Sequence, residues 1–171
     1  PLTIGLVPPA TRSQRIEALM RAADFAEKVG IPSITTHVGF IPENPNDPDY
    51  YGTVEAIKRV ANYCKHKALM FCFETGQETP VTLLRTIEDV NTGNLGVNFD
   101  PANLIMYGKA NPVDALDILG PYVKGVHAKD GLYPTNGKKL GKEVPLGEGL
   151  VNFPVLIPKL KRFGYNGAIT I

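Results

Sequence analysis

The stretch LMFCFETGQETPVTLLRTIEDVNTGNLGVNFD, residues 69–100, contains the features that decide the fold. Its two ends, Leu69–Glu74 and Leu95–Phe99, are short apolar runs of the kind that form strands covered on both faces of a sheet. Between them, Thr79–Val90 places its apolar residues at helical spacing and has a proline near the first turn. A strand, a helix and a second strand in this order predict the βα repeat of a parallel sheet.

The same alternation extends over the rest of the chain. Further strands are predicted at Leu2–Val7, Ser33–Phe40, Val123–Ala128 and Ala168–Ile171, and further helices at Ser13–Val29, Asp49–Lys67, Asn111–Leu119 and Val151–Phe163. The longest segments without a helical pattern, Ile41–Pro48 and Gly131–Gly149, both follow a strand. Long loops on that side of a parallel sheet usually carry the functional site, so we expect an α/β fold with its site there.

Composition narrows the functional classes. The 171 residues include 18 Lys and Arg against 17 Asp and Glu, without the basic excess of a nucleic-acid or membrane-surface binder. No apolar run approaches the roughly 20 residues of a membrane span, and no signal peptide is visible. Two cysteines exclude a disulfide scaffold and favour a reducing compartment, so we expect a cytoplasmic location.

Polar side chains with metal-binding or acid–base capacity follow four consecutive strands. They are His37, Glu74, Asp100 and His127, with Lys129 and Asp130 just beyond the last. In a (β/α)8 barrel the carboxyl ends of the strands surround one pocket, so these side chains would meet there. Carboxylate and imidazole groups together form a ligand set for Mn²⁺, Zn²⁺, Fe²⁺ or Co²⁺.

Each of these residues also has a simpler interpretation. Glu74 alone reads as a solvated carboxylate or a helix-capping group, and Asp100, next to a proline, reads as the cap of a turn. Lys129 has the alternative of a salt bridge with Asp130 or Glu148. Either histidine alone fits the core or the rim of the fold. The joint placement at strand ends is what favours a shared site.

The sequence resembles the sugar isomerase/epimerase superfamily, which shares the xylose isomerase-like TIM barrel. The matching stretches are ITTHVGF (34–40), FCFETG (71–76), GVNFDPAN (96–103), GVHAKDG (125–131) and VPLGEG (144–149). Relatives include ketose 3-epimerases and inosose dehydratases. The resemblance implies a parallel (β/α)8 TIM barrel, of which residues 1–171 would be a single domain of about six βα units, the third to the eighth, truncated at both ends.

The resemblance also implies a divalent metal, with Mn²⁺ expected and Zn²⁺, Mg²⁺ or Co²⁺ as alternatives. Glu74, Asp100 and His127 match three of the family's ligands. The fourth, a second Glu, is expected at or just after Ile171. Asn103 stands where several relatives carry a histidine.

By the same resemblance, the expected reaction is isomerisation or epimerisation of a small sugar, sugar phosphate or polyol. A carboxylate would remove a proton next to a carbonyl, and the cation would hold the enediolate oxygens. Glu74 is then one of the acid–base pair, and His37 binds a substrate hydroxyl. Lys129 would neutralise a carboxylate or phosphate on the substrate. Substrate contacts are also expected at Asn103, Asp130 and Glu148.

Two other classes compete with this interpretation. An endonuclease IV-like phosphodiesterase would need a cluster of several metals and a basic face for DNA. It would also need more histidines than the three in this sequence. A non-catalytic, ligand-binding fragment is the other alternative. Without the fourth ligand, we expect little or no activity from residues 1–171 alone. We also expect the open barrel edges to be covered by a partner chain, by segments of a longer barrel outside residues 1–171, or by a second copy of the chain.

Overall fold

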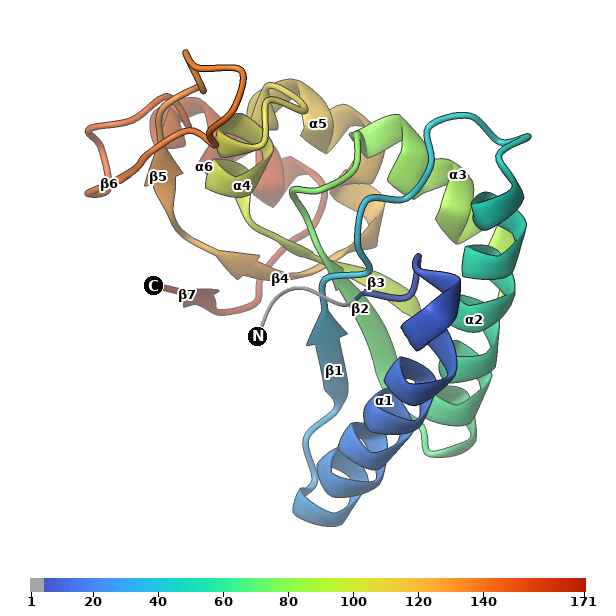
Figure 1. Cartoon of the computed structure of the whole chain (residues 1–171). Coiled ribbons are helices and arrows are strands. Elements are labelled where there is room, and N and C mark those ends of the chain that lie inside the picture. The colour runs from blue at the N-terminus through green and yellow to red at the C-terminus, as the bar shows by residue number, and fades with distance from the viewer. Residues whose placement is uncertain (1–4) are drawn as a thin grey trace. The chain divides into compact units, whose positions relative to one another are not determined.

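The computed structural model describes residues 5–171 as an alternation of helices and strands (Figure 1). In chain order these are α1 (Pro9–Val29), β1 (Ser33–Thr36), α2 (Pro48–His66), β2 (Met70–Glu74), α3 (Pro80–Val90), β3 (Leu95–Phe99), α4 (Pro101–Met106), α5 (Pro112–Leu119), the 3-10 helix η1 (Gly120–Tyr122), β4 (Val123–His127), β5 (Asp130–Gly131), β6 (Glu143–Val144), α6 (Phe153–Arg162) and β7 (Ile169–Thr170). None of the helices within these residues has the length and apolar character needed to cross a membrane.

The main sheet has five strands in the order β1-β2-β3-β4-β7. The β1–β2, β3–β4 and β4–β7 pairs are parallel, which confirms the predicted class of fold. Along β2, the backbone N–H groups of Phe71 and Thr75 donate to the carbonyls of Asn94 and Asn98. Because consecutive strands are neighbours and run in one direction, the ends of β2, β3 and β4 reach the same edge of the sheet.

Most predicted elements are present, with shorter strands. The strand predicted at Ser33–Phe40 ends at Thr36. Of the strand predicted at Leu2–Val7, the first three residues lie outside the described residues. Gly5–Val7 is not a strand, although the Leu6 N–H donates to the Val38 carbonyl. The predicted loop Gly131–Gly149 contains one strand of a small antiparallel pair, β6, which pairs with β5 at the loop's beginning.

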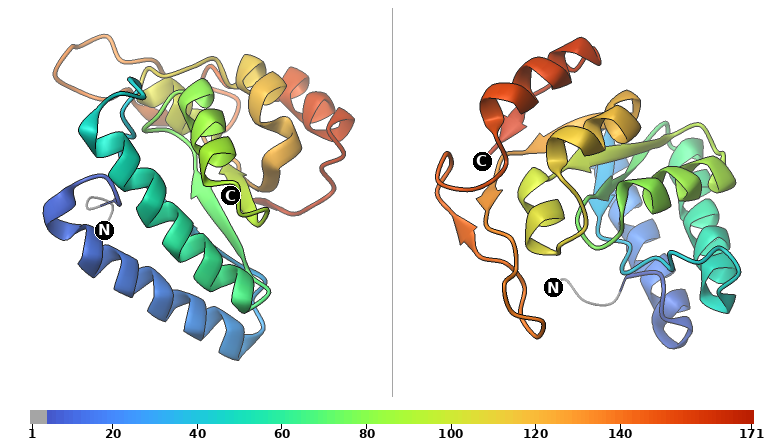
Figure 2. Two further views of the ribbon diagram at one scale, coloured as in Figure 1. Left: turned by 90° about the vertical axis from the view of Figure 1, so that its right-hand side faces the viewer. Right: turned by 90° about the horizontal axis from the view of Figure 1, so that it is seen from above.

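Contacts divide the chain into two compact units, one of Pro1–Phe73 with Thr82–Gly96 and one of Glu74–Val81 with Val97–Ile171. In the first unit, α1 and α2 lie side by side and run in the same direction (Figure 2). Their inward faces are apolar and buried, as the helical periodicity predicts. These buried residues are Ile16, Leu19, Ala23 and Ala26 of α1, and Val54, Ile57, Val60, Ala61 and Cys64 of α2.

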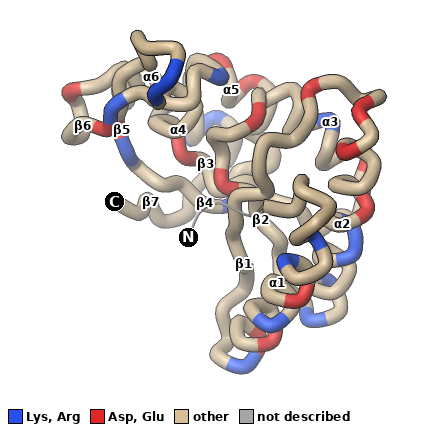
Figure 3. The backbone as a smooth tube through the Cα atoms, in the orientation of Figure 1, with Lys and Arg blue, Asp and Glu red and all other residues tan. Residues whose placement is uncertain are grey.

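Charged residues of both signs occur along α1 and α2 (Figure 3). Lys67, just after α2, pairs with Asp24 at 2.9 Å and with Glu27 at 2.7 Å, both on α1. Opposite charges thus face each other across the two helices. Exposed pairs of this kind contribute little to stability, so the buried apolar faces hold this unit together.

The second unit has its own core beneath the strand ends. Its fully buried side chains are Val97 and Phe99 of β3, Leu104 of α4, Leu116 and Leu119 of α5, Val126 of β4, and Leu156 and Leu160 of α6. The helix α4 was not predicted, although Asp100 followed by Pro101 is a typical helix start. With six residues, α4 is too short to show an amphipathic period. The single-domain prediction for residues 1–171 remains a prediction.

The buried amide of Asn94 joins two elements of the first unit, and it supplies a stability test. Its Nδ2 donates to the carbonyls of Ala61 and Leu69 at 2.9 and 3.0 Å. We expect Asn94→Ala to lower the free energy of unfolding by about 1–3 kcal/mol, because a buried carbonyl loses its donor. Urea denaturation measures this. The exposed Asn166→Ala serves as the control, and equal stability of the two variants would contradict the prediction.

Candidate metal centre

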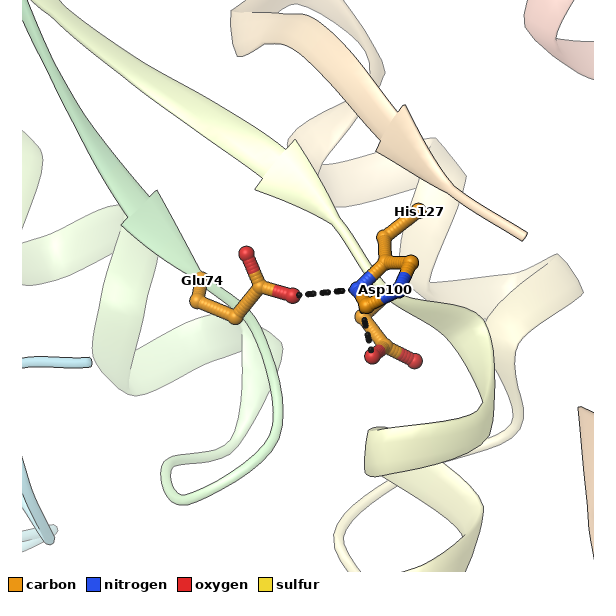
Figure 4. A group of neighbouring side chains, drawn as sticks. All are labelled: Glu74, Asp100 and His127. Carbon is orange, nitrogen blue, oxygen red and sulfur yellow. Dashed lines mark hydrogen bonds and ion pairs between the residues drawn. The ribbon is translucent and has the colours of Figure 1, made fainter. Parts of the chain in front are cut away.

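Three potential ligands converge in the second unit from the ends of three successive strands. Glu74 is the last residue of β2, Asp100 follows β3 directly, and His127 is the last residue of β4. One ligand atom of each lies within 4.8 Å of the others (Figure 4). The His127 Nδ1 atom is 3.2 Å from Glu74 Oε1 and 3.4 Å from Asp100 Oδ2. The predicted convergence of these three residues is therefore present in the structure.

The two carboxylate oxygens of Asp100 have different surroundings. Oδ1 accepts the N–H of Asn103 at 3.0 Å and so caps α4. The Thr75 hydroxyl fixes the backbone of Asp100 from both sides, accepting its N–H and donating to its carbonyl. Oδ2 is buried and has no hydrogen-bond partner among the described residues. Asp100 thus caps a helix, as its simpler interpretation holds, while its second oxygen faces the other two ligands.

Burial makes the Asp100 carboxyl group a weaker acid than usual. Because the carboxylate is removed from water, its pKa rises from 3.8 to about 6. The Asn103 N–H and the charges of Lys129 and His127 lower the pKa, while the charge of Glu74 raises it. A cation bound among these groups would stabilise the carboxylate form. Burial, rather than any charged neighbour, is thus the main cause of the raised pKa of Asp100.

Lys129 lies beside the three ligands and is bound by two carboxylates. Its Nζ is 2.7 Å from Glu143 Oε2 and 3.7 Å from Asp100 Oδ2. Burial alone would lower the pKa of Lys129, but Glu143, Asp100 and Glu74 together raise it, so the side chain is cationic. A salt bridge was one alternative for this lysine, with Asp130 or Glu148 as partner. In the structure its carboxylate partners are instead Glu143 and Asp100.

Asp130 is enclosed by backbone N–H groups of the segment that follows it. Its Oδ1 accepts from Gly131 and Val151, and its Oδ2 accepts from Gly147 and Gly149, at 2.9–3.1 Å. The residue is 1% exposed. One buried carboxylate thus closes the base of the loop that carries Glu143. Its predicted contact with substrate stays a prediction.

A pocket of about 290 Å³ opens next to the ligands in the same unit. Its lining includes His127 and Lys129 from the end of β4, Glu143 and Leu146 from the loop, and Ile171. The pocket thus combines a ligand, a cation and apolar side chains. Charged groups together with apolar side chains are typical of a site for a small molecule.

The other predicted site residues are placed differently. His37 is half-buried just after β1 and belongs to the first unit, so it is not part of the cluster described here. Asn103 is buried in the first turn of α4, where its backbone N–H binds Asp100. Glu148 is exposed in the loop. Substrate contacts by these three residues remain predictions.

Two residues of the centre were missed by sequence reasoning. Asn98 donates from Nδ2 to Glu74 Oε2 at 2.5 Å, and Glu143 binds Lys129. Asn98 did leave a signal, because it is a polar residue inside the otherwise apolar strand Leu95–Phe99. Glu143 left none, since its loop has no periodic pattern from which a pairing could be predicted.

Glu78 is a buried acid close in sequence to the centre, in the segment between β2 and α3. It is 3% exposed, and burial raises its pKa from 4.5 to about 8. A hydrogen bond with its own backbone N–H and the charge of Lys109 partly offset this rise. Glu78 is therefore protonated in the folded protein at neutral pH.

Comparison with known proteins identifies the family. The model of the xylose isomerase-like TIM barrel matches residues 2–171, and the chain belongs to this family. A crystal structure of a xylose isomerase domain protein from Planctomyces limnophilus is 42% identical, with a TM-score of 0.94. That comparison covers 99% of this chain and 62% of the other. The chain therefore spans about three-fifths of this relative's length.

More distant structures share the fold alone. A xylose isomerase-like TIM barrel protein from Mycobacterium smegmatis in complex with magnesium is 19% identical, with a TM-score of 0.77, covering 97% of this chain and 62% of that one. A D-tagatose 3-epimerase-like protein is 23% identical, with a TM-score of 0.79, covering 95% of this chain and 63% of that one.

Because Asp130 accepts four backbone hydrogen bonds, we expect its substitution to cause a large loss of stability. We expect Asp130→Ala to lower the free energy of unfolding by about 2–4 kcal/mol, because several buried N–H groups lose their acceptor. Urea denaturation measures the loss. Limited trypsin digestion should cut at Lys138 and Lys139 faster than in the wild type. The exposed Glu148→Gln in the same loop is the control, and unchanged digestion of Asp130→Ala would refute the assignment.

Glu78 predicts a specific pH dependence of stability. Between pH 4.5 and 8 the unfolded chain loses this proton while the folded chain keeps it, so the free energy of unfolding falls as pH rises. Glu78→Gln should remove this part of the slope, so that the variant gains stability relative to the wild type up to about pH 8. Denaturation at several pH values in EDTA measures the difference. Exposed Glu88→Gln should leave the slope unchanged.

Proposed function

We propose that this chain belongs to a divalent-metal-dependent isomerase or epimerase of a small sugar or polyol. The observation that carries the proposal is the convergence of Glu74, Asp100 and His127 at the ends of three neighbouring parallel strands. Family membership supports the class of enzyme. The D-tagatose 3-epimerase-like neighbour supports a sugar-sized substrate, although that likeness concerns the fold.

The residues present fit a metal ion. Asp100 Oδ2 is a buried acceptor without a hydrogen-bond partner among the described residues, and Glu74 Oε1 and His127 Nδ1 face it. Two carboxylate oxygens and one imidazole nitrogen suit Mn²⁺, and also Zn²⁺, Mg²⁺ or Co²⁺. We propose Mn²⁺ as the resident ion.

The remaining residues supply the acid–base and binding functions. When bound, the cation would supply stabilisation of the negative charge that develops on the substrate oxygens. Glu74 is the proposed acceptor of the proton next to the substrate carbonyl. Asp100 is unsuited to that role, because one of its oxygens caps α4 and the residue is fully buried. Among residues 5–171 the cluster holds a single glutamate, so we propose that the second acid–base group comes from outside them.

The position of Lys129 bears on the kind of substrate. Its charge is already neutralised by Glu143 and Asp100, so an anionic substrate group would have to compete with two carboxylates. This favours a neutral sugar or polyol over a sugar phosphate. We also propose a cytoplasmic location, in keeping with the two free, buried cysteines. A further proposal is that a second copy or other segments cover the open sheet edges.

Metal binding is the first test of this function. We expect Mn²⁺ at 100 times its dissociation constant to stabilise the protein by about 2.7 kcal/mol. Asp100→Asn should abolish this stabilisation, because asparagine still caps α4 but replaces the charged Oδ2 with an amide. Thermal unfolding with and without Mn²⁺ measures the effect. Exposed Asp114→Asn is the matched control, and an unaltered Mn²⁺ response in Asp100→Asn would argue against the site.

Proton exchange tests the chemistry itself. Because residues 1–171 alone are expected to show little or no activity, the test uses the protein together with the segment that supplies the second acid–base group. Incubation of its Mn²⁺-loaded form with ketoses in D₂O should place deuterium on the carbon next to the carbonyl, as detected by mass spectrometry. Glu74→Gln should remove this exchange, because the amide cannot accept the proton. Exchange at equal rates in the wild type and Glu74→Gln would disprove the role of Glu74.

A further inference from the structure

The Glu74 carboxylate has a distinct neighbour at each oxygen. Oε1 faces His127 Nδ1 at 3.2 Å, whereas Oε2 accepts a hydrogen bond from Asn98 Nδ2 at 2.5 Å. A carboxylate held at one oxygen by a fixed donor loses freedom to rotate about its last bond. Asn98 thus determines which oxygen of Glu74 is turned toward the other two ligands.

The position of the Asn98 amide depends in turn on the facing strand. A bulge in the β3–β4 pairing follows the Val97↔Val123 pair, so that Asn98 is paired with Gly125 and Lys124 is the extra residue. A Cβ atom on Gly125 would lie 2.3 Å from Asn98 Oδ1. The amide therefore occupies the space that a side chain at position 125 would take.

We propose that Asn98 is a positioning residue of the metal centre and that Gly125 provides the space it needs. The Asn98 amide holds Oε2 of Glu74 and leaves Oε1 facing His127, where these residues would hold a cation. This inference rests on the proposed function, because it requires that the cluster bind a divalent ion. Groups that hydrogen-bond to metal ligands commonly affect metal affinity by roughly 10- to 100-fold.

Two single variants remove this contact by independent routes. Asn98→Ala deletes the donor directly. Gly125→Ala keeps the Asn98 amide but pushes it out of position. The atom that must move is the far end of a side chain, so the fold should be retained. Gly137→Ala is the matched control, because a Cβ there meets nothing within 4 Å.

The readout is the dissociation constant of Mn²⁺, measured by titration calorimetry on the metal-free protein. Electron paramagnetic resonance of the bound Mn²⁺ reports its ligand geometry. We expect Asn98→Ala and Gly125→Ala each to weaken binding roughly 10- to 100-fold and to alter the resonance spectrum. Gly137→Ala should match the wild type in both measurements. A merely structural role would lower the melting temperature of the metal-free protein without changing the spectrum.

The double variant Asn98→Ala/Gly125→Ala tests whether the two residues act together. With the amide gone, the added methyl group has nothing to displace, so the double variant should bind Mn²⁺ as Asn98→Ala does. Weaker binding by the double variant would show that Gly125→Ala acts through β4 instead, and would overturn the link. Unchanged affinity in both single variants would overturn the inference alone. Failure of the wild type to bind Mn²⁺ would overturn the proposed function together with the inference.

Discussion

Parallel pairing of consecutive strands is the constraint on which the rest of this site depends. In a parallel sheet the strands β2, β3 and β4 all end at one edge, so residues separated by 25 or more positions in the chain become neighbours. The hydrogen bond from the Thr75 N–H to the Asn98 carbonyl continues the pairing to the point where the ligands leave the sheet. Glu74, Asp100 and His127 meet because the backbone brings them together, before any side chain interacts.

Asp100 shows how the fold and the site share one residue. Its Oδ1 caps the N-terminus of α4, and its Oδ2 is left without a hydrogen bond among the described residues. The hydrogen bond at Oδ1 stabilises the helix. The lack of a hydrogen bond at Oδ2 costs free energy in the absence of a cation, because a buried carboxylate oxygen has lost its water. The stability of α4 and of the surrounding core therefore keeps the Asp100 carboxylate in a buried position that is unfavourable by itself.

The sequence was informative where its patterns are periodic. The apolar run Leu95–Phe99 and the helix Pro80–Val90 lie at or within one residue of their predicted positions, since burial on both faces or on one face imposes a clear spacing. The placement of polar residues at strand ends also predicted that Glu74, Asp100 and His127 would meet, and in the structure they do. By contrast, α4 was too short for periodicity, and the loop contact between Lys129 and Glu143 depends on tertiary packing that no local pattern encodes. Asn98 was visible as a polar residue in an apolar strand, but its hydrogen bond to Glu74 depends on how β2 and β3 pair, which no local pattern encodes.

The way in which Asp130 holds its loop has an evolutionary consequence. Among the described residues, its carboxylate accepts hydrogen bonds only from backbone N–H groups, those of Gly131, Gly147, Gly149 and Val151, so the attachment does not depend on the side chains in between. Substitutions within residues 132–146 thus leave these four hydrogen bonds in place, although replacing Glu143 would remove its ion pair with Lys129 and a side chain at Gly141 would meet the Leu132 carbonyl. A loop held in this way can vary at its other positions while Glu74, Asp100, His127 and the core stay unchanged.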